Sequence, residues 1–493
     1  MKINYLLLIF TILFSKTIYA QTNLKSVVKN ATTKAPVPFA TIKFDEQSGV
    51  MTNEEGVFKI ENDQVLKDSI SISSIGYETL KVASVNLDTV TYLKPEVLEL
   101  ATVFVTDKNL SIDQIIDSIQ INLAKNYPQK HVQNQFFCRE ATTQRILNKD
   151  LGFKKSTIKE IDKHLVDSIA ESLPSTTSWF VETAGSYVSD SKNKLKLTIA
   201  KALIIENDQQ SKTLAEYSES IKALLKRNLK PDSYLKIKSG IVGTKIPLDS
   251  IITDKTTDKK RFENYENNYF VKHRTENYTK LISETFSNRK LPLDVFSNRN
   301  DYYFELLGFQ EFKEEIVYKI TFQPKEEEGF QGAFYVNITD FSVLQVTYQS
   351  TAKVYDSKFN LFGIHFNHTA HKGTIQYEKN SLGYYFPKYI SIEDTELFTI
   401  QRPLKIIEKN KNVKGRRKQN ELKLALNFAI QSTLKKQLIN YNSKEITADS
   451  FKNQEASTSV KVNKRSAYDP EFWKGTTVLE PNTALQEFNA TTD

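Results

Sequence analysis

The sequence predicts a mainly β protein with helices: an N-terminal Greek-key-like β-sandwich, a helical linker and a large antiparallel β-rich α+β domain. Short alternating strands separated by tight turns fill residues 21–105. From Tyr302 onward, large apolar residues alternate with polar ones at the period of a half-buried strand. The 30 Phe and 23 Tyr suit such strands. We expect residues 1–20 to be a signal peptide, 21–105 the sandwich, 106–130 the linker, 131–475 the α+β domain and 476–493 a loose tail.

The first 20 residues have the pattern of a cleaved secretory signal peptide. Lys2 supplies the positive charge, Tyr5–Phe14 is almost wholly apolar, and Ser15–Ala20 becomes polar and ends in a small residue. The apolar run is about half the roughly 20 residues that a membrane-spanning helix needs. No cysteine lies directly after this run, so we expect no lipid attachment there. The sequence therefore predicts an exported, periplasmic protein, peripheral to the outer membrane.

The sandwich strands can be assigned from their alternation. Ala40, Ile42 and Phe44 share one face of a strand, and Ile70 and Ile72 point inward between serines. Residues 52–56 form a turn in which a glycine can take positive φ. About seven such strands predict a sandwich.

Three blocks of this region resemble a known family. Ala35–Ile42, Met51–Phe58 and Ser74–Thr79 look like the carboxypeptidase regulatory-like domain of Bacteroidetes envelope proteins, and Leu100–Val105 is similar to its closing strand. The resemblance implies a non-catalytic module that precedes outer-membrane receptors and other exported proteins. The motif Tyr468–Trp473 resembles the C-terminal end of flavobacterial proteins with this domain.

The middle of the chain predicts helices. Ser111 can cap a helix whose isoleucines form one stripe and which ends before Pro128. Residues 210–228 carry a second apolar stripe of helical spacing. Residues 253–277 are highly polar and could form a loop or a solvated helix.

A long antiparallel meander is predicted in the second half. Strands around Ile316–Phe322, Phe334–Ile338 and Val343–Tyr348 are separated by turns, and a further hairpin turns at residues 380–383. This succession of strands and turns is similar to that of periplasmic lipoprotein-carrier half-barrels. A small outer-membrane barrel is the alternative, disfavoured because Lys319, Thr321 and Asn337 would interrupt its apolar outer face.

The charge of the chain argues against nucleic acid as a partner and makes an anionic lipid or polysaccharide worth considering. The formal net charge of +8 falls to +6 without Lys2 and Lys16, which is too mild to imply nucleic acid. Arg402–Lys418 holds eight basic residues against Glu408. We expect a solvated loop tip; the alternative is a contact for anionic lipid or polysaccharide.

Few residues suggest chemistry. Cys138 is the only cysteine, which excludes an intramolecular disulfide, and its apolar neighbours predict a buried packing role. On a strand, His365 and His371 would share a face while His368 points the other way, so we do not expect a metal site. Nucleophile-elbow, zinc-protease, P-loop and dinucleotide motifs are absent from the sequence, and we predict no cofactor.

The candidate ligand-binding residues are the large aromatics of the meander: Tyr318, Phe322, Phe334 and Tyr348. They either fill a core or line the concave face of the sheet. We expect a non-enzymatic envelope protein that binds or scaffolds a lipid, glycan or protein partner. The alternatives are a hydrolase with the sandwich as accessory domain, for which no catalytic residue is predicted, and a structural partner of an outer-membrane transporter.

Overall fold

A computed structural model describes residues 24–44, 49–60, 69–83, 86–96, 110–192, 194–240, 242–252, 259–283, 295–296, 298–313, 315–351, 359–361, 363–410, 412–414 and 417–488. The expected signal peptide and the expected closing strand Leu100–Val105 lie outside these residues. Contacts divide the chain into two units, Met1–Pro95 and Glu96–Asp493.

The first unit is the predicted sandwich of seven strands. A three-stranded sheet has the order β4-β1-β7 and a four-stranded sheet the order β3-β2-β5-β6. Their bounds are β1 Leu24–Asn30, β2 Thr41–Lys43, β3 Gly49–Met51, β4 Val57–Ile60, β5 Ser69–Ser73, β6 Leu80–Ala83 and β7 Val90–Leu93. Ile42, Ile70 and Ile72 lie in its core, as their alternation predicts. The turn before β4 is held by Oδ1 of Asn53, which accepts from the backbone nitrogens of Glu55 and Val57.

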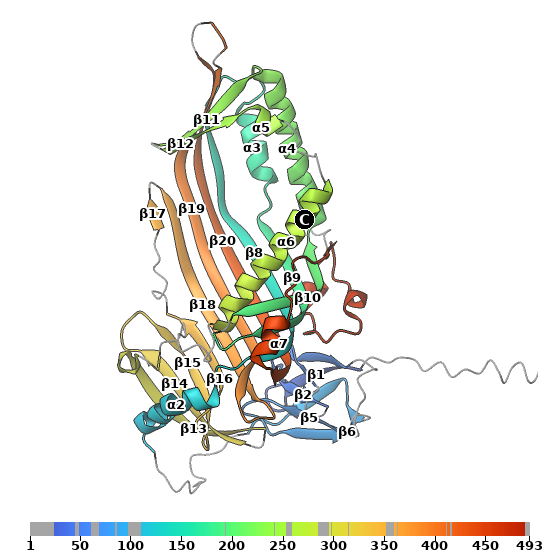
Figure 1. The fold of residues 1–493 in the computed structure, drawn as a ribbon. Helices are drawn as coiled ribbons and strands as arrows, with labels where there is room; N and C mark the ends of the chain where they lie inside the picture. Colours follow the sequence, from blue (N-terminus) through green and yellow to red (C-terminus); the bar gives the residue numbers. More distant parts are fainter. Residues whose placement is uncertain are drawn as a thin grey trace, which may run out of the picture. The chain divides into compact units, whose positions relative to one another are not determined.

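The second unit is built on one sheet of 14 strands (Figure 1). Its main path runs β13-β14-β15-β16-β18-β19-β20-β8-β9-β10-β21, with β11, β12 and β17 attached at its side. The bounds are β8 Val132–Ser156, β9 Thr176–Ser189, β10 Leu195–Glu206, β11 Ser233–Ser239, β12 Val242–Pro247, β13 Tyr302–Phe312, β14 Glu315–Pro324, β15 Phe330–Asn337, β16 Val343–Ser350, β17 Phe359–Leu361, β18 Ile364–Lys379, β19 Tyr385–Asn410, β20 Lys418–Glu445 and β21 Val462–Arg465. Neighbours are antiparallel, as predicted, except for the short parallel pair β10–β21.

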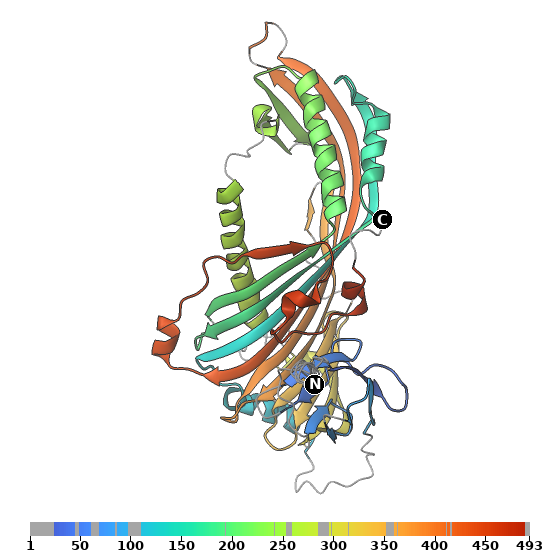
Figure 2. The same cartoon turned by 90° about the vertical axis from the view of Figure 1, so that its right-hand side faces the viewer.

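The strands at the centre of this sheet are unusually long. β20 has 28 residues, so at about 3.3 Å per residue it extends over roughly 90 Å. Figure 2 shows the long strands curving from one end of the unit to the other. They therefore link two apolar cores, one at each end.

The helices α2 to α6 lie on one face of the sheet, which we call the helical face. Their bounds are α2 Ile112–Asn126, α3 Lys163–Ser172, α4 Asp208–Asn228, α5 Asp249–Ile252 and α6 Lys259–Ser283; α7 Ala448–Asn453 and α8 Thr483–Gln486 are short. Leu224 of α4 and Val166 of α3 pack in one cluster with Leu422 and Leu424 of β20. These leucines alternate with outward lysines, so one side of the strands is apolar and the other is charged.

Helix α2 begins and ends where the sequence predicts. Ser111 and Gln114 form a capping box, and the stripe Ile115, Ile116 and Ile119 is buried. The helix is a packed part of the second unit, because Nδ2 of Asn126 donates to the carbonyl oxygen of Asp340 at 2.8 Å.

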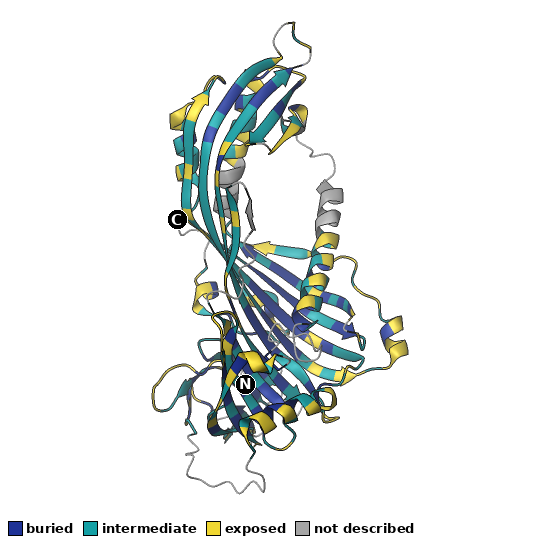
Figure 3. Cartoon of the chain, turned by 90° about the vertical axis from the view of Figure 1, so that its left-hand side faces the viewer, coloured by how far each residue is buried: buried dark blue, intermediate teal, exposed yellow. Residues whose placement is uncertain are grey.

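The polar segment whose structure the sequence left open is largely helical. Residues 253–258 lie outside the described part, and α6 follows at Lys259–Ser283. Its last turns carry Val271, Tyr278 and Leu281, which are buried, so this end of the helix is covered although its composition suggested solvation. Figure 3 shows the buried residues concentrated in the middle of the sheet.

The C-terminal segment packs against the other face of the sheet, which corrects the expectation of a loose tail. Arg139 of β8 donates to the carbonyl oxygens of Leu479 and Glu480, at 2.8 and 3.1 Å. Leu479 and Leu485 are buried, and the ring of Phe488 lies 5.3 Å from that of Phe180. Only residues 489–493 of the expected tail lie outside the described part.

Candidate functional site

The four aromatic candidates share one face of the sheet, but they form a closed core. Tyr318, Phe322, Phe334 and Tyr348 are each at most 4 % exposed. Phe334 stacks on Phe322 at 4.5 Å and on Phe296 at 4.7 Å. Their burial favours core packing, one of the two roles that the sequence left open for them, over lining of an open groove.

The three histidines are arranged differently from the prediction. The pairing of β18 with β19 shifts by one residue between His368 and Ala370, which is a β-bulge. His368 then lies opposite Glu396, and His371 opposite Asp394, two residues earlier on the same strand. The bulge thus brings His368 and His371 to one face, whereas His365 faces the other way and is exposed.

His371 lies between a hydroxyl and a carboxylate. Its Nδ1 is 2.5 Å from Oδ1 of Asp394, and its Nε2 is 3.3 Å from the hydroxyl of Tyr348. Burial is the largest single cause and raises the pKa of Asp394, but the hydrogen bond with His371 and the nearby positive charges together outweigh it, so the net pKa is lowered. This order of groups is that of a catalytic triad. Tyr348 is only 4 % exposed, however, so its hydroxyl is closed to a substrate. Among the described residues, no group of three potential ligands could hold a metal ion.

A second buried polar cluster lies between β8 and α6. Glu140 pairs with Arg274, and Thr183 bonds the hydroxyl of Tyr278. Burial, and then the charge of Glu140, raises the pKa of the Cys138 thiol to about 12. The thiol is therefore neutral at physiological pH and inert, in line with the packing role expected for Cys138.

A cavity of about 70 Å³ lies at the end of the sheet where β8 starts and β20 ends. It is formed by the segment 128–134, the end of β9, the turn into β19, the end of β20 and Ile282 of α6. Small-molecule sites usually measure roughly 300–1,000 Å³. This cavity therefore fits one small group of a larger partner, not a whole molecule.

The cavity wall combines satisfied and unsatisfied polar groups. Asn440 is fully buried, accepts from the hydroxyl of Tyr187 at 3.1 Å and donates to the carbonyl oxygen of Pro387 at 2.7 Å. Oδ1 of Asn134 and Oγ of Ser443 are buried with no hydrogen-bond partner. Since buried polar atoms are nearly always bonded, these two atoms mark the position where a polar group would be stabilised.

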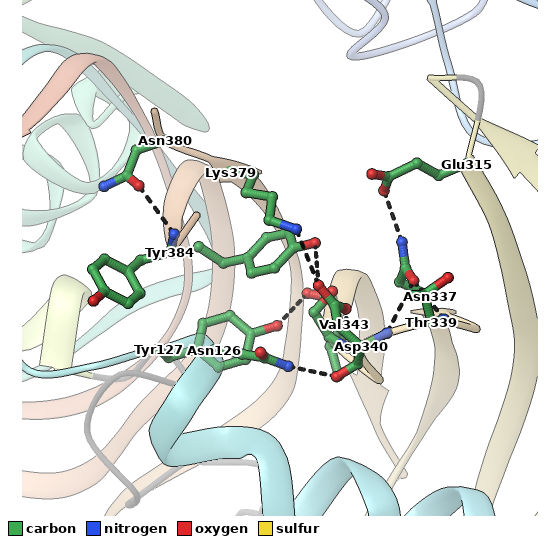
Figure 4. Close-up of polar contacts among 12 residues, drawn as sticks. Asn126, Tyr127, Glu315, Asn337, Thr339, Asp340, Val343, Lys379, Asn380 and Tyr384 are labelled. Carbon is green, nitrogen blue, oxygen red and sulfur yellow. Dashed lines mark hydrogen bonds and ion pairs between the residues drawn. The ribbon is translucent and has the colours of Figure 1, made fainter. Parts of the chain in front are cut away.

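A network centred on Asp340 fixes the neighbouring wall of the cavity (Figure 4). The carboxylate of Asp340 accepts from the hydroxyl of Tyr385 at 2.9 Å and from Nζ of Lys379 at 3.2 Å. Burial raises the pKa of Asp340, but the hydrogen bonds from Ser342, Tyr385 and Lys379 together lower it by more. The net pKa is therefore below its usual value. Tyr385 also lines the cavity, so the network holds that wall rigidly.

The rim of the cavity is charged and aromatic. Nζ of Lys130 lies 3.1 Å from Oε1 of Glu445 and 5.4 Å from the centre of the Tyr384 ring. Sequence reasoning missed these residues and the cavity, because single polar residues at strand ends carry no periodic signal. Only the pairing of distant strands in the folded sheet brings these residues together.

Only part of the basic run Arg402–Lys418 lies in the loop that the sequence predicted. Residues up to Asn410 belong to β19, and Arg402 is buried, with Nη2 donating to the carbonyl oxygen of Ser239 at 2.5 Å. Glu408 is also buried and accepts from Oγ of Ser233 at 2.7 Å. Lys405 and Lys409 alternate with these buried residues along β19 and face the opposite side.

The family comparison identifies the first unit. Residues 24–105 match the model of the CarboxypepD_reg-like domain, so the chain carries this domain, as its sequence blocks suggested. The match covers a minor part of the chain and reaches only the first ten residues of the second unit. No curated protein sequence matches the chain. The Bacteroidetes origin remains a prediction.

Solved structures give only distant similarity. A putative outer membrane lipoprotein-sorting protein domain from Vibrio parahaemolyticus is 6 % identical over 68 % of this chain and 95 % of its own, with a TM-score of 0.20. A DUF1329 family protein from Desulfovibrio piger is 8 % identical over 69 % and 97 %, with a TM-score of 0.20. A MucA/MucB complex of Pseudomonas aeruginosa gives 8 % over 65 % and 93 %, with a TM-score of 0.18. Scores this low do not establish a common fold, and the likeness to lipoprotein-carrier half-barrels remains a prediction.

In the part of the chain that the structure describes, no helix is both long and apolar enough to cross a membrane.

Proposed function

We propose that the protein is a non-enzymatic binding or scaffolding protein of the cell envelope, and that the cavity at the end of the sheet holds one polar group of its partner. The observation that carries this proposal is the pair of buried, unpartnered atoms Asn134 Oδ1 and Ser443 Oγ in one cavity. An unsatisfied buried polar atom costs about 1–3 kcal/mol, which a bound polar group would offset.

The partner class follows from the cavity's size and rim. A space of about 70 Å³ takes a hydroxyl, an amide or a similar group, so the rest of the partner must lie across the rim. There, the Tyr384 ring and the Lys130–Glu445 pair offer an aromatic surface and two charges. Such a rim suits a glycan or peptide segment, whose hydroxyl or amide groups would enter the cavity.

The test is purification from the native host and mass spectrometry of the retained lipids, glycans and proteins. Asn134→Leu removes the unpartnered oxygen, and Asn148→Leu, on the same strand but away from the cavity, is the matched control. We expect the wild type and Asn148→Leu to retain one class of molecule that Asn134→Leu loses. Retention of nothing, or equal retention by all three proteins, would contradict the proposal.

A further inference from the structure

A row of four lysines crosses four neighbouring strands at the end of the sheet away from the cavity. Lys238 of β11 lies opposite Lys405 of β19, which lies opposite Lys423 of β20. Lys423 in turn lies opposite Lys155 of β8. Neighbouring strands are about 4.8 Å apart. Like charges directly opposite each other destabilise a sheet, so stability does not explain this row.

More lysines extend the row along the strands. Lys236 lies opposite Lys245 of β12, and Lys409 lies opposite Lys418. We call these residues the lysine face: Lys155, Lys236, Lys238, Lys245, Lys405, Lys409, Lys418 and Lys423. The charge of Lys238, followed by burial and the charges of Lys409 and Lys245, lowers the pKa of Lys236. The positive charges are therefore close enough to act on one another.

One carboxylate lies among them. Oε1 of Glu421 is 2.7 Å from Nζ of Lys405 and 3.4 Å from Nζ of Lys423, and Lys418 pairs with its other oxygen. These three lysine side chains are still 38 %, 43 % and 32 % exposed. A single carboxylate shared by three ammonium groups leaves a strong net positive charge facing solvent.

The strands that carry the lysine face are apolar on their other side. Leu404 and Ile406 alternate with Lys405 and pack with α3 and α4 on the helical face. The lysine face is therefore the side of the sheet turned away from these helices. Lys414, between β19 and β20, is exposed as well.

We propose that the lysine face docks on a membrane surface that carries anionic lipid headgroups. The charges spread over a sheet instead of converging on one point, which suits many phosphates in a plane. All eight are lysines, which act as point charges without the planar fork that recognises one carboxylate or phosphate in a fixed geometry. This inference is independent of the proposed function, because it uses the opposite end of the sheet.

The test is co-sedimentation of the purified protein with vesicles of phosphatidylcholine containing 0, 20 or 40 % phosphatidylglycerol. The test variant is Lys155→Gln with Lys236→Gln and Lys238→Gln. The control variant loses the same charge at exposed lysines elsewhere, by Lys159→Gln, Lys192→Gln and Lys272→Gln. Both are compared with wild type in 50 and 500 mM salt. The distance over which surface charges act on one another is about 10 Å at 0.1 M salt and becomes shorter at higher concentrations.

We expect wild type and the control variant to bind the 40 % vesicles in low salt, and the test variant to bind at least tenfold more weakly. The test variant should unfold at the same temperature as wild type or a higher one, because repulsion within the row is relieved. Equal binding by both variants, or no binding of wild type to any vesicle, would overturn the proposal. Binding to dextran sulfate without binding to vesicles would also overturn it, in favour of a polysaccharide.

Discussion

The indole nitrogen of Trp473 donates a hydrogen bond of 2.7 Å to Oε2 of Glu182, whose other oxygen lies 2.6 Å from Nε of Arg139. Glu182 is fully buried and Arg139 nearly so. A carboxylate in this position is stable only while both partners are present. The motif Tyr468–Trp473 therefore has a structural role, because its Trp473 holds the C-terminal segment against the centre of the sheet.

Trp473→Phe should destabilise the protein by about 1–3 kcal/mol, because one oxygen of the buried Glu182 loses its donor. The measurement is the free energy of unfolding in urea. Trp179→Phe, at a half-buried position, is the matched control and should change it by less than about 0.5 kcal/mol. Equal effects of the two substitutions would refute the fastening role.

Phe334→Ala should cost about 3–5 kcal/mol, because Phe334 is fully buried between two stacked rings. Tyr303→Ala, at a 58 % exposed position of β13, should cost less than about 0.5 kcal/mol. Thermal unfolding of both variants checks this. A small cost for Phe334→Ala would mean that this core is open, and would revive the aromatic groove as a ligand site.

Cys138 should not react with a thiol reagent at pH 8 while the protein is folded. Its pKa is raised to about 12, first by burial and then by Glu140, so the thiolate is scarce and also inaccessible. Full reaction is expected only after unfolding in urea. Rapid labelling of the native protein would show that α6 does not cover β8.

The stability contributed by Glu421 should depend on pH. Hydrogen bonds from Lys405 and Lys418 lower its pKa from 4.5 to about 2. Because the pKa is lower in the folded state, this stabilisation is complete above about pH 5 and is lost as the pH falls from 4.5 through 2. Glu421→Gln should therefore be less stable than wild type at pH 7, and the gap should shrink at pH 3. Glu471→Gln, at an exposed position, is the control; a gap independent of pH would contradict the assignment.

The sequence was sufficient wherever a pattern was local and periodic. Ser111 predicted the cap of α2, and the alternation around Phe334 predicted the hairpins of the meander. The face of His371 was mispredicted, because a single bulged residue between His368 and Ala370 inverts the alternation and no local sequence pattern indicates it. The unusual length of β20 was likewise not visible, since alternation alone does not show where a strand ends.

The cavity and the lysine face depend on register between distant strands. Asn134 and Ser443 are 309 positions apart in the chain and meet only because β8 pairs with β20. The row from Lys238 to Lys155 likewise needs three separate registers. A lysine-rich sequence contains many lysines that have no special role, so the alignment of the lysine face could not be predicted from the spacing of its residues.

Binding at the cavity is tested most directly by saturation-transfer NMR with a fixed probe panel. The panel consists of N-acetylglucosamine oligomers, N-acetylated tetrapeptides and short-chain phosphatidylglycerol. We predict that glycan or peptide probes receive saturation from wild type and from Asn148→Leu, and lose it with Asn134→Leu, whose fold should be at least as stable because a buried unpartnered oxygen is removed. No transfer to any probe, or equal transfer from all three proteins, would contradict the account.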